Sequence, residues 1–246
     1  MIGAEIGRVA ALWRYPVKSM AAEQLEEVEA SWHGLAGDRR WAFVRDGLVR
    51  SGFPFLTIRE RPDMGQYRPS FLDPARPDRS ATVVRTPAGE DLDIVDSALA
   101  TELGDGTRVI KLDRGIFDVM PLSLITTQTI ASLGALTGAE LDVQRFRPNL
   151  LVEATGDATW PEDAWVGTVL RIGGMRMRVD QRDKRCAVVN VDPASTERDP
   201  AILRVIARER QACAGVYGSA VAPGRVAVGD PVLLEDRAVR REWRPG

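Results

Sequence analysis

A cysteine lies at the end of a very basic segment, residues 181–186 (QRDKRC). Arg182, Lys184 and Arg185 surround Cys186, and neighbouring cations favour the thiolate form of a cysteine. A thiolate is both a nucleophile and a soft metal ligand. Cys186 also suits a small buried apolar residue at the start of a strand over 187–191. This segment alone therefore leaves a reactive and a structural role open.

A second candidate is the string RFRPN, residues 145–149. If it is extended, Arg145 and Arg147 point to one face and Phe146 to the other. Two guanidinium groups on one face suit a phosphate or another planar anion, because each can donate two hydrogen bonds. Asn149 follows the proline and can both donate and accept. A solvated strand end with surface ion pairs would have the same sequence.

Two loops near the N-terminus offer further anion-binding groups. Lys18 and Ser19 follow a predicted strand and supply a charge and a hydroxyl group. Arg39 and Arg40 come later, and the alternation of an extended chain points one of them inward. Asp38 is placed to orient one of these arginines. Ordinary loop chemistry explains each piece equally well when it is taken alone.

Composition excludes several other chemistries. The chain has 246 residues, two cysteines (Cys186 and Cys213) and one histidine (His33), too few for a disulfide scaffold, a four-ligand zinc site or a protein-bound iron–sulfur cluster. Cys213 is interpreted as a packed thiol and His33 as a turn residue. The net charge of −2 argues against nucleic acid as a partner. The N-terminus has no signal-peptide pattern and no segment reads as a membrane span, which favours a reducing cytoplasm.

The elements that must position these residues are mostly strands. We predict a mostly β (α+β) fold, with a small barrel-like unit in the first hundred residues and a few helices in the second half. Strands are predicted at 6–15, 25–31, 81–85, 90–95, 149–152, 169–172, 175–179, 187–191 and 225–234. A hairpin is predicted for 40–45 and 48–50 around Asp46-Gly47, and a long loop for 61–80. Helices are predicted from Asp96 to Leu103, over 127–136, and from Pro200 to about Gln211. A domain boundary is placed after residue 104, giving units 1–104 and 105–246.

Four strings in order give a resemblance to a known family. They are YPVKSM at 15–20, GDRRW at 37–41, RFRPN at 145–149, and KRC followed by VDP at 184–193. Together they resemble the MOSC family with its N-terminal β-barrel extension. This family includes the mitochondrial amidoxime-reducing component, related bacterial reductases and the C-terminal part of molybdenum-cofactor sulfurases. The resemblance implies a small N-terminal β-barrel packed on a larger β-barrel-like MOSC domain, with the molybdenum–molybdopterin cofactor at their junction.

The resemblance also implies roles for individual residues. Cys186 would be the molybdenum ligand and the catalytic residue. The residues implied around the pterin and its phosphate are Lys18, Ser19, Arg39, Arg147, Asn149, Lys184, Arg185 and Tyr217. The chain departs from the family pattern at Val119, Met120, Lys184 and Asn190, where hydroxyl residues are usual. These departures remove hydroxyl donors and place the details of pterin contact and substrate use in question.

Three functions remain open. The first is an oxidoreductase that reduces N-hydroxylated or N-oxide small molecules, with electrons from a separate ferredoxin- or flavin-type protein, since the chain has no flavin or iron–sulfur motif of its own. The second is a carrier that handles the molybdenum cofactor or its sulfur without turnover. The third is a metal-free module that binds another phosphorylated ligand. Metal content and turnover of a reducible substrate distinguish the three.

Overall fold

A computed structural model describes residues 3–48 and 51–235 of the chain. Its largest feature is a closed barrel of seven strands in the order β11-β10-β14-β13-β12-β16-β1, closed by pairing of β11 with β1. The barrel strands are β1 Ala4–Arg14, β10 Leu122–Thr126, β11 Leu150–Ala154, β12 Val169–Ile172, β13 Met175–Lys184, β14 Cys213–Ala222 and β16 Pro231–Glu235. A short strand, β2 Glu23–Leu25, extends the sheet beyond β1. The predicted mostly β fold is confirmed.

Alternation along the strands fills the barrel. In β13, Met175, Met177 and Val179 are buried while Arg176 and Arg178 are exposed, as expected for a strand with one face toward a core. Inward side chains from all seven strands form one apolar cluster. The barrel is thus a packed core, and ligands have access only at its ends.

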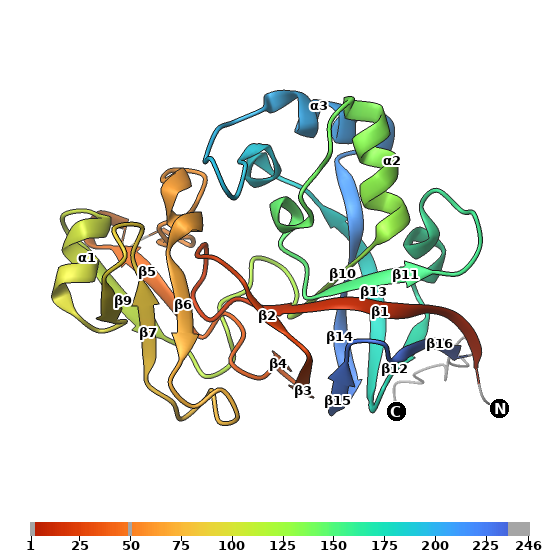
Figure 1. Cartoon of the computed structure of the whole chain (residues 1–246), viewed down its shortest axis with the longest axis horizontal. Helices are drawn as coiled ribbons and strands as arrows, with labels where there is room; N and C mark the ends of the chain where they lie inside the picture. The colour runs from red at the N-terminus through yellow and green to blue at the C-terminus, as the bar shows by residue number, and fades with distance from the viewer. Residues whose placement is uncertain (1–2, 49–50, 236–246) are drawn as a thin grey trace, which may run out of the picture.

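A smaller β-rich unit packs beside the barrel (Figure 1). Its strands are β5 Trp41–Arg45, β6 Arg68–Phe71, β7 Thr82–Arg85, β8 Asp91–Asp93 and β9 Thr107–Lys111, and they form the sheets β5-β9 and β6-β7-β8. Helix α1, Ser97–Leu103, covers it and contributes Leu99 and Leu103 to a separate core. A third sheet joins β3 Glu27–Ser31, β4 Gly34–Leu35 and β15 Gly224–Ala227.

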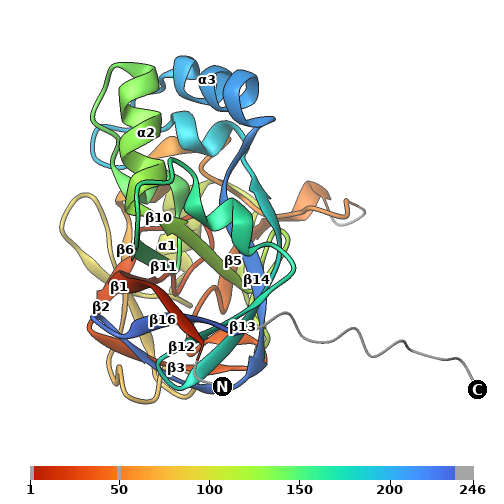
Figure 2. The same cartoon turned by 90° about the vertical axis from the view of Figure 1, so that its right-hand side faces the viewer.

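The predicted helices are confirmed, because their end signals are local. The Asp96 side chain accepts a hydrogen bond from Ala98 N and begins α1. Helix α2, Thr127–Thr137, ends at Gly138 in the left-handed conformation (φ 71°). Helix α3, Pro200–Arg210, begins with Asp199 as its N-cap. Figure 2 shows α2 and α3 together at one end of the molecule, where they form a third apolar cluster. None of the helices in the described part of the chain has the length and apolar character needed to cross a membrane.

Two predicted β elements are wrong. Residues Asp46–Leu48 form a 3-10 helix, and β5 pairs with β9 about sixty residues later instead of forming a local hairpin; Val49 and Arg50 lie outside the described residues. The expected strand at 187–191 is a 3-10 helix, Ala187–Asn190. Short apolar runs do not by themselves distinguish strands from helices. The predicted loop 61–80 contains a 3-10 helix, Pro62–Gln66, and strand β6, which pairs with β7.

The chain passes between the two units more than once. Strand β1 precedes residue 104 yet pairs with β11 and β16 in the barrel. Strand β9 follows residue 104 yet pairs with β5 of the smaller unit. The units therefore share chain segments, and a boundary after residue 104 stays a prediction.

Candidate functional site

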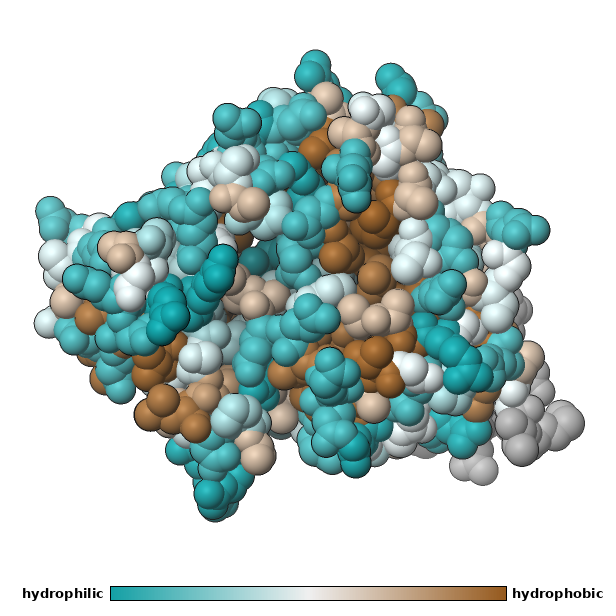
Figure 3. All heavy atoms as spheres, in the orientation of Figure 1, coloured by the Kyte–Doolittle hydropathy of each residue, from teal (hydrophilic) through white to brown (hydrophobic). Residues whose placement is uncertain are grey.

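A cavity of about 770 Å³ opens at the barrel mouth, between the barrel and the smaller unit. The surface is hollowed between these two parts of the molecule (Figure 3). All nine predicted site residues line the cavity: Lys18, Ser19, Arg39, Arg147, Asn149, Lys184, Arg185, Cys186 and Tyr217. They come from loops and strand ends that are far apart in sequence. The structure therefore brings the whole predicted set together, while their individual roles remain predictions.

Cys186 follows the end of β13 and occupies the N-cap position of the 3-10 helix Ala187–Asn190. Its side chain is partly exposed and lines the cavity. The alternative of a buried apolar residue at the start of a strand is therefore wrong. Of the neighbouring cations, Lys184 and Arg185 also line the cavity, whereas Arg182 turns away to Asp163 and to the carbonyl of Arg210.

The structure distinguishes Arg39 from Arg40. Arg39 lines the cavity, donates to Asp38 Oδ2 at 2.6 Å and donates to the carbonyl of Arg147 at 3.1 Å. Burial alone would lower the pKa of Arg39, but the Asp38 carboxylate, Tyr15 and Tyr217 together hold that pKa above its ordinary value. Arg40 points to Asp78 and to the carbonyl of Asp113 instead.

Arg147 is a partly buried cation that forms no ion pair with a carboxylate among the described residues. Its guanidinium lies 4.2 Å from the centroid of the Tyr15 ring, and that of Arg39 lies 4.5 Å from the same centroid. Its Nη2 atom is buried and has no hydrogen-bond partner. Burial, with Arg39 close by, lowers the pKa of Arg147 to about 10. A buried guanidinium with an unmet donor is the kind of group that an anionic ligand satisfies.

The expectation that Arg145 and Arg147 share one face of an extended strand is wrong. Val143–Phe146 form a 3-10 helix, and Arg147 ends it in the left-handed conformation (φ 49°). This turn separates the two guanidinium groups. Arg145 forms an ion pair with Asp192 at 2.5 Å, while Arg147 turns toward Tyr15.

Asn149 is 1% exposed and its amide is fully engaged. Its Oδ1 accepts from Ser123 N at 3.2 Å, and its Nδ2 donates to the Trp13 carbonyl and to Asp38 Oδ2, each at 3.2 Å. Asp38 in turn holds Arg39. The amide therefore acts on the cavity chiefly by positioning other groups.

Lys18 and Ser19 lie on the opposite wall, where the loop after β1 turns. Lys18 forms an ion pair with Asp118, and its Nζ lies 5.3 Å from the Phe55 ring centroid. Burial lowers the pKa of Lys18, and the more exposed Asp118 opposes that shift without cancelling it. Ser19 has a left-handed backbone (φ 67°), as do Arg39 and Arg147. Strained backbone conformations of this kind tend to concentrate at functional sites.

Most of the hydrogen bonds of the Arg185 guanidinium go to backbone carbonyls and not into the cavity. Its Nε donates to the Ala214 carbonyl and its Nη1 to the Phe146 carbonyl, both at 2.7 Å. A Cβ on Gly215 (φ 77°) would lie 2.7 Å from the Leu124 carbonyl oxygen and 3.1 Å from Arg185 Nη2, so both the backbone conformation and the close packing require glycine here. Arg185 thus connects β14 to the turn that carries Arg147.

Sequence reasoning missed Asp183. It lines the cavity, is 1% exposed, and lies 2.8 Å from Arg185 Nη2 across an ion pair. Burial raises its pKa to about 6, against the opposing effects of Arg185, of the hydrogen bond from Ser123 Oγ and of the nearby Tyr217 hydroxyl group. Burial and the nearby Asp183 also raise the pKa of Tyr217. The available signal was that Asp183 is the one acid in the basic string QRDKRC.

The charge balance of the cavity suits an anion. Seven cationic side chains line it, namely Lys18, Arg39, Arg59, Arg145, Arg147, Lys184 and Arg185. Three acids line it, namely Glu60, Asp118 and Asp183. The chain as a whole carries a net charge of −2, so the excess of cations is local. The cavity thus has more cationic than acidic side chains and contains a partly exposed cysteine, Cys186. These features suit a phosphorylated cofactor that also binds a thiolate.

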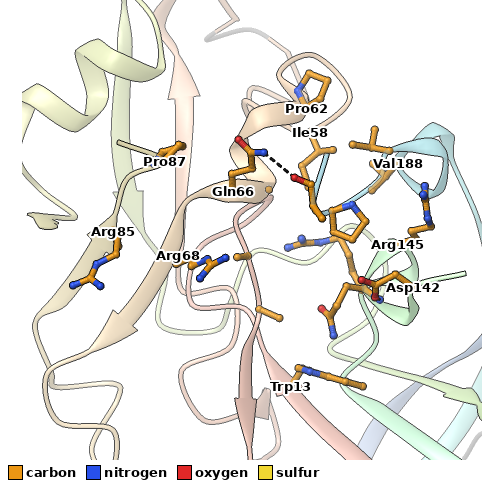
Figure 4. Close-up of a pocket in the computed structure, with 18 of the residues that line it drawn as sticks. Trp13, Ile58, Pro62, Gln66, Arg68, Arg85, Pro87, Asp142, Arg145 and Val188 are labelled. Carbon is orange, nitrogen blue, oxygen red and sulfur yellow. Dashed lines mark hydrogen bonds between the residues drawn. The ribbon is translucent and has the colours of Figure 1, made fainter. Parts of the chain in front are cut away.

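A second cavity of about 810 Å³ adjoins the first. The two share Ile58, Arg145, Arg147 and Val188, which form the wall between them. Figure 4 shows Trp13 at one end of this second cavity and the hydrogen bond from Gln66 Nε2 to the Ala194 carbonyl, 3.0 Å long, above it. No cysteine lies among its lining residues, so the thiol chemistry belongs to the first cavity.

Two family models match the chain and between them cover most of it. The model described as the MOSC N-terminal beta barrel domain matches residues 6–115, and the model described as the MOSC domain matches residues 113–233.

Named relatives agree at low identity. The Homo sapiens protein "Mitochondrial amidoxime reducing component 2" is 23% identical, over 93% of this chain and 83% of its own length, and its Bos taurus counterpart is 22% identical over the same shares. The Drosophila mojavensis protein "Molybdenum cofactor sulfurase" is 25% identical over 79% of this chain and 29% of its own length. Among solved structures, the YUAD protein from Bacillus subtilis has a TM-score of 0.52 at 12% identity, covering 93% of this chain and 94% of its own, which supports the fold alone.

Proposed function

The chain belongs to the MOSC family, in the form that carries an N-terminal MOSC β-barrel domain, and from this membership we propose that it binds the molybdenum cofactor in the cavity at the barrel mouth. One observation carries the proposal. The nine residues implied by the resemblance line a single cavity that has an excess of cations and contains a partly exposed thiol.

In this proposal, one residue of the chain binds the metal and others bind the anionic end of the cofactor. Cys186 supplies one thiolate ligand to molybdenum. Arg147 offers a buried donor without a partner to the anionic end of the cofactor, and Lys18 and Arg39 add charge beside it. No group of three or more His, Cys, Asp or Glu in residues 3–48 and 51–235 is placed to hold a metal ion, so the remaining ligands would come from the cofactor. When bound, the cofactor supplies two-electron redox chemistry at molybdenum.

We further propose that the loaded protein is a reductase of N-hydroxylated or N-oxide small molecules. The relatives named amidoxime reducing components, which this chain matches over 93% of its length, support this reaction class. The overall change converts R–NHOH, two electrons and two protons to R–NH2 and water. The electrons would come from a separate donor protein of the ferredoxin or flavin type.

The test compares Cys186→Ser with Cys213→Ser, because Cys213 is also partly exposed but does not line the cavity. The proteins are purified from a molybdenum-replete host, and molybdenum and oxidised pterin are measured per chain. We expect near-stoichiometric molybdenum in the wild type and in Cys213→Ser, and a loss of at least about tenfold in Cys186→Ser. Equal molybdenum in all three would remove Cys186 as the ligand. Reduction of benzamidoxime with an artificial donor then tests the reductase.

A carrier of the cofactor or its sulfur is the second candidate. The similarity to a molybdenum cofactor sulfurase over 79% of this chain favours it, as does the replacement of hydroxyl residues by Val119 and Met120 in the cavity wall. A carrier would pass bound cofactor to an apo-enzyme without turning over a reducible substrate. Transfer without turnover would therefore replace the reductase proposal.

A further inference from the structure

Asp183 owes its position to an irregularity in a barrel strand. The pairing of β13 with β14 shifts register between Arg182 and Lys184, so Asp183 lies in a β-bulge. Bulges re-aim a side chain and are frequent beside active sites. Here the bulge places a carboxyl group in the wall of the cavity, three residues before Cys186.

The surroundings of this carboxyl group favour a bound proton. Oδ2 accepts a hydrogen bond from Ser123 Oγ at 3.2 Å, while Oδ1 is buried and has no partner. A buried carboxylate oxygen without a donor is costly, and protonation removes that cost. The charged and titratable groups that face it are Arg185 on its own segment, Arg39 from the loop after β4, and Tyr217 on β14. Burial outweighs both arginines, and the pKa of Asp183 rises to about 6.

The other two carboxyl groups of the cavity and the single histidine of the chain are poorly suited to deliver a proton. Lys18, with Arg59 and Arg39, holds the pKa of the half-exposed Asp118 below its ordinary value and against partial desolvation. Glu60 is exposed and forms an ion pair with Arg45 outside the cavity. His33 is exposed in a turn and does not line the cavity. Tyr217 does line it, and burial and Asp183 keep its hydroxyl group protonated by raising its pKa.

We propose that Asp183 holds a proton that the reduction consumes and hands it to the bound substrate through the Tyr217 hydroxyl group. The inference rests on the proposed reductase function. Cleavage of the N–O bond of R–NHOH requires two electrons, supplied by the donor protein, and two protons. Tyr217 gives one proton to the departing oxygen, which leaves as water, and regains one from the Asp183 carboxyl group, which is reprotonated from solvent. The second proton reaches the nitrogen from solvent and completes R–NH2. Asp183 is thus a positioning residue that acts through Tyr217.

The test uses Asp183→Asn, Tyr217→Phe and a matched control, Asp180→Asn. Asp180 lies on the same strand but bonds Ser219 and Arg178 outside the cavity. Molybdenum per chain is measured first, then kcat and KM for benzamidoxime against pH with reduced viologen as donor. We expect wild-type kcat to fall as pH rises through about 6, because only the protonated carboxyl group can donate. Asp183→Asn and Tyr217→Phe should each lower kcat per bound molybdenum by about 10²-fold at nearly unchanged KM.

A second readout needs no cofactor. The infrared C=O stretch of a protonated buried carboxyl group should appear in the apo-protein below pH 6, persist in Tyr217→Phe and Asp180→Asn, and be absent from Asp183→Asn. Absence of this band from the wild type overturns the proposal. So does a kcat profile that both variants leave unchanged at full molybdenum. If no form of the protein binds molybdenum, the proposed function fails while the band still decides whether Asp183 holds the proton.

Discussion

At the scale of single residues, the two guanidinium groups on Tyr15 differ in what balances them. Arg39 is paired with Asp38, which is fully buried. Arg147 is equally close to the ring but has no carboxylate partner and has a buried donor without an acceptor. A buried charge without a partner is a cost to folding that a ligand can offset. Arg147 is therefore the residue whose presence is best explained by binding.

Replacing each arginine with methionine should separate these roles. Arg39→Met leaves Asp38 buried without its partner and should lower the free energy of unfolding of the apo-protein by roughly 3 kcal/mol. Arg147→Met removes a charge without a partner and should change it by less than about 1 kcal/mol, or raise it. Urea unfolding of the apo-proteins measures both. Molybdenum content should fall in both variants. A large loss of apo-stability in Arg147→Met would contradict the binding role.

The raised pKa of Asp183 predicts a pH-dependent stability. Because the folded-state pKa of about 6 exceeds the ordinary 3.8, the carboxyl group contributes stability below pH 3.8 and loses that contribution as pH rises through 6. Asp183→Asn keeps a neutral side chain at every pH. The wild type should therefore lose about 2 kcal/mol relative to Asp183→Asn between pH 4 and pH 7. Urea unfolding of both proteins across this range measures it, and a constant difference would show that the pKa of Asp183 is not raised in the folded protein.

At the scale of elements, Asn149 connects three segments of the barrel mouth. Its amide joins the end of β1 at Trp13, the start of β10 at Ser123, and the loop that carries Asp38. Through Ser123 the same network reaches Asp183, and through Asp38 it reaches Arg39. One side chain thus sets the relative positions of groups on opposite walls of the cavity.

Asn149→Ala should therefore destabilise the apo-protein. It leaves Ser123 N without its acceptor and removes one donor from Asp38, which should cost about 3 kcal/mol in the free energy of unfolding. Gln144→Ala, in the adjoining turn, is the comparison and should cost less, because Gln144 Nε2 has no hydrogen-bond partner and its Oε1 accepts only from the Tyr15 hydroxyl group, which can still donate to the Pro148 carbonyl. Urea unfolding compares the two. An apo-protein of wild-type stability that no longer retains cofactor would instead make Asn149 a direct cofactor contact.

The elements that sequence predicts well are those with local signals. Helices α1, α2 and α3 follow from Asp96, Gly138 and Asp199-Pro200, whose capping chemistry acts within a few residues. The Asp46-Gly47 hairpin fails because the partner of β5 lies about sixty residues away. The strand β14 was missed because its small residues, CAGVYGSAVA, carry little strand signal.

The same contrast holds for the site. The nine residues that line the cavity were identified through strings that resemble a family, since spacing alone left each of them ambiguous. Asp183 lies in a segment that the sequence singled out, but no function was predicted for it, because its neighbours Ser123 and Tyr217 lie on other strands. The predicted orientation of the Arg145 side chain was wrong. The prediction assumed the alternating side chains of an extended strand, whereas this segment forms a 3-10 helix.

At the scale of the whole molecule, the cavities lie between two units that hold separate cores. Two side-chain hydrogen bonds join the 3-10 helix region of the smaller unit to the loop after the Ala187–Asn190 helix on the barrel side. Gln66 Nε2 donates to the Ala194 carbonyl at 3.0 Å, and Arg198 Nη2 donates to the Arg59 carbonyl at 2.8 Å. The cavity walls at Arg147 and Cys186 belong to the barrel side, while Lys18 and Ile58 belong to segments that pack with the smaller core. A ligand in the cavity would thus contact both units at once.

Cofactor loading should therefore stabilise both units together. A ligand present at about 100 times its Kd adds roughly 2.7 kcal/mol to the folded state. For a chain of this size that raises Tm by about 5 to 10 °C. Calorimetry of loaded and apo-protein measures the shift, and hydrogen exchange should show added protection at both 53–60 and 183–189, the facing walls of the cavity. Cys186→Ser, prepared the same way, should retain the apo values. Protection confined to the barrel wall would place the cofactor outside the space between the units, because a ligand that spans the cavity must order both sides of it.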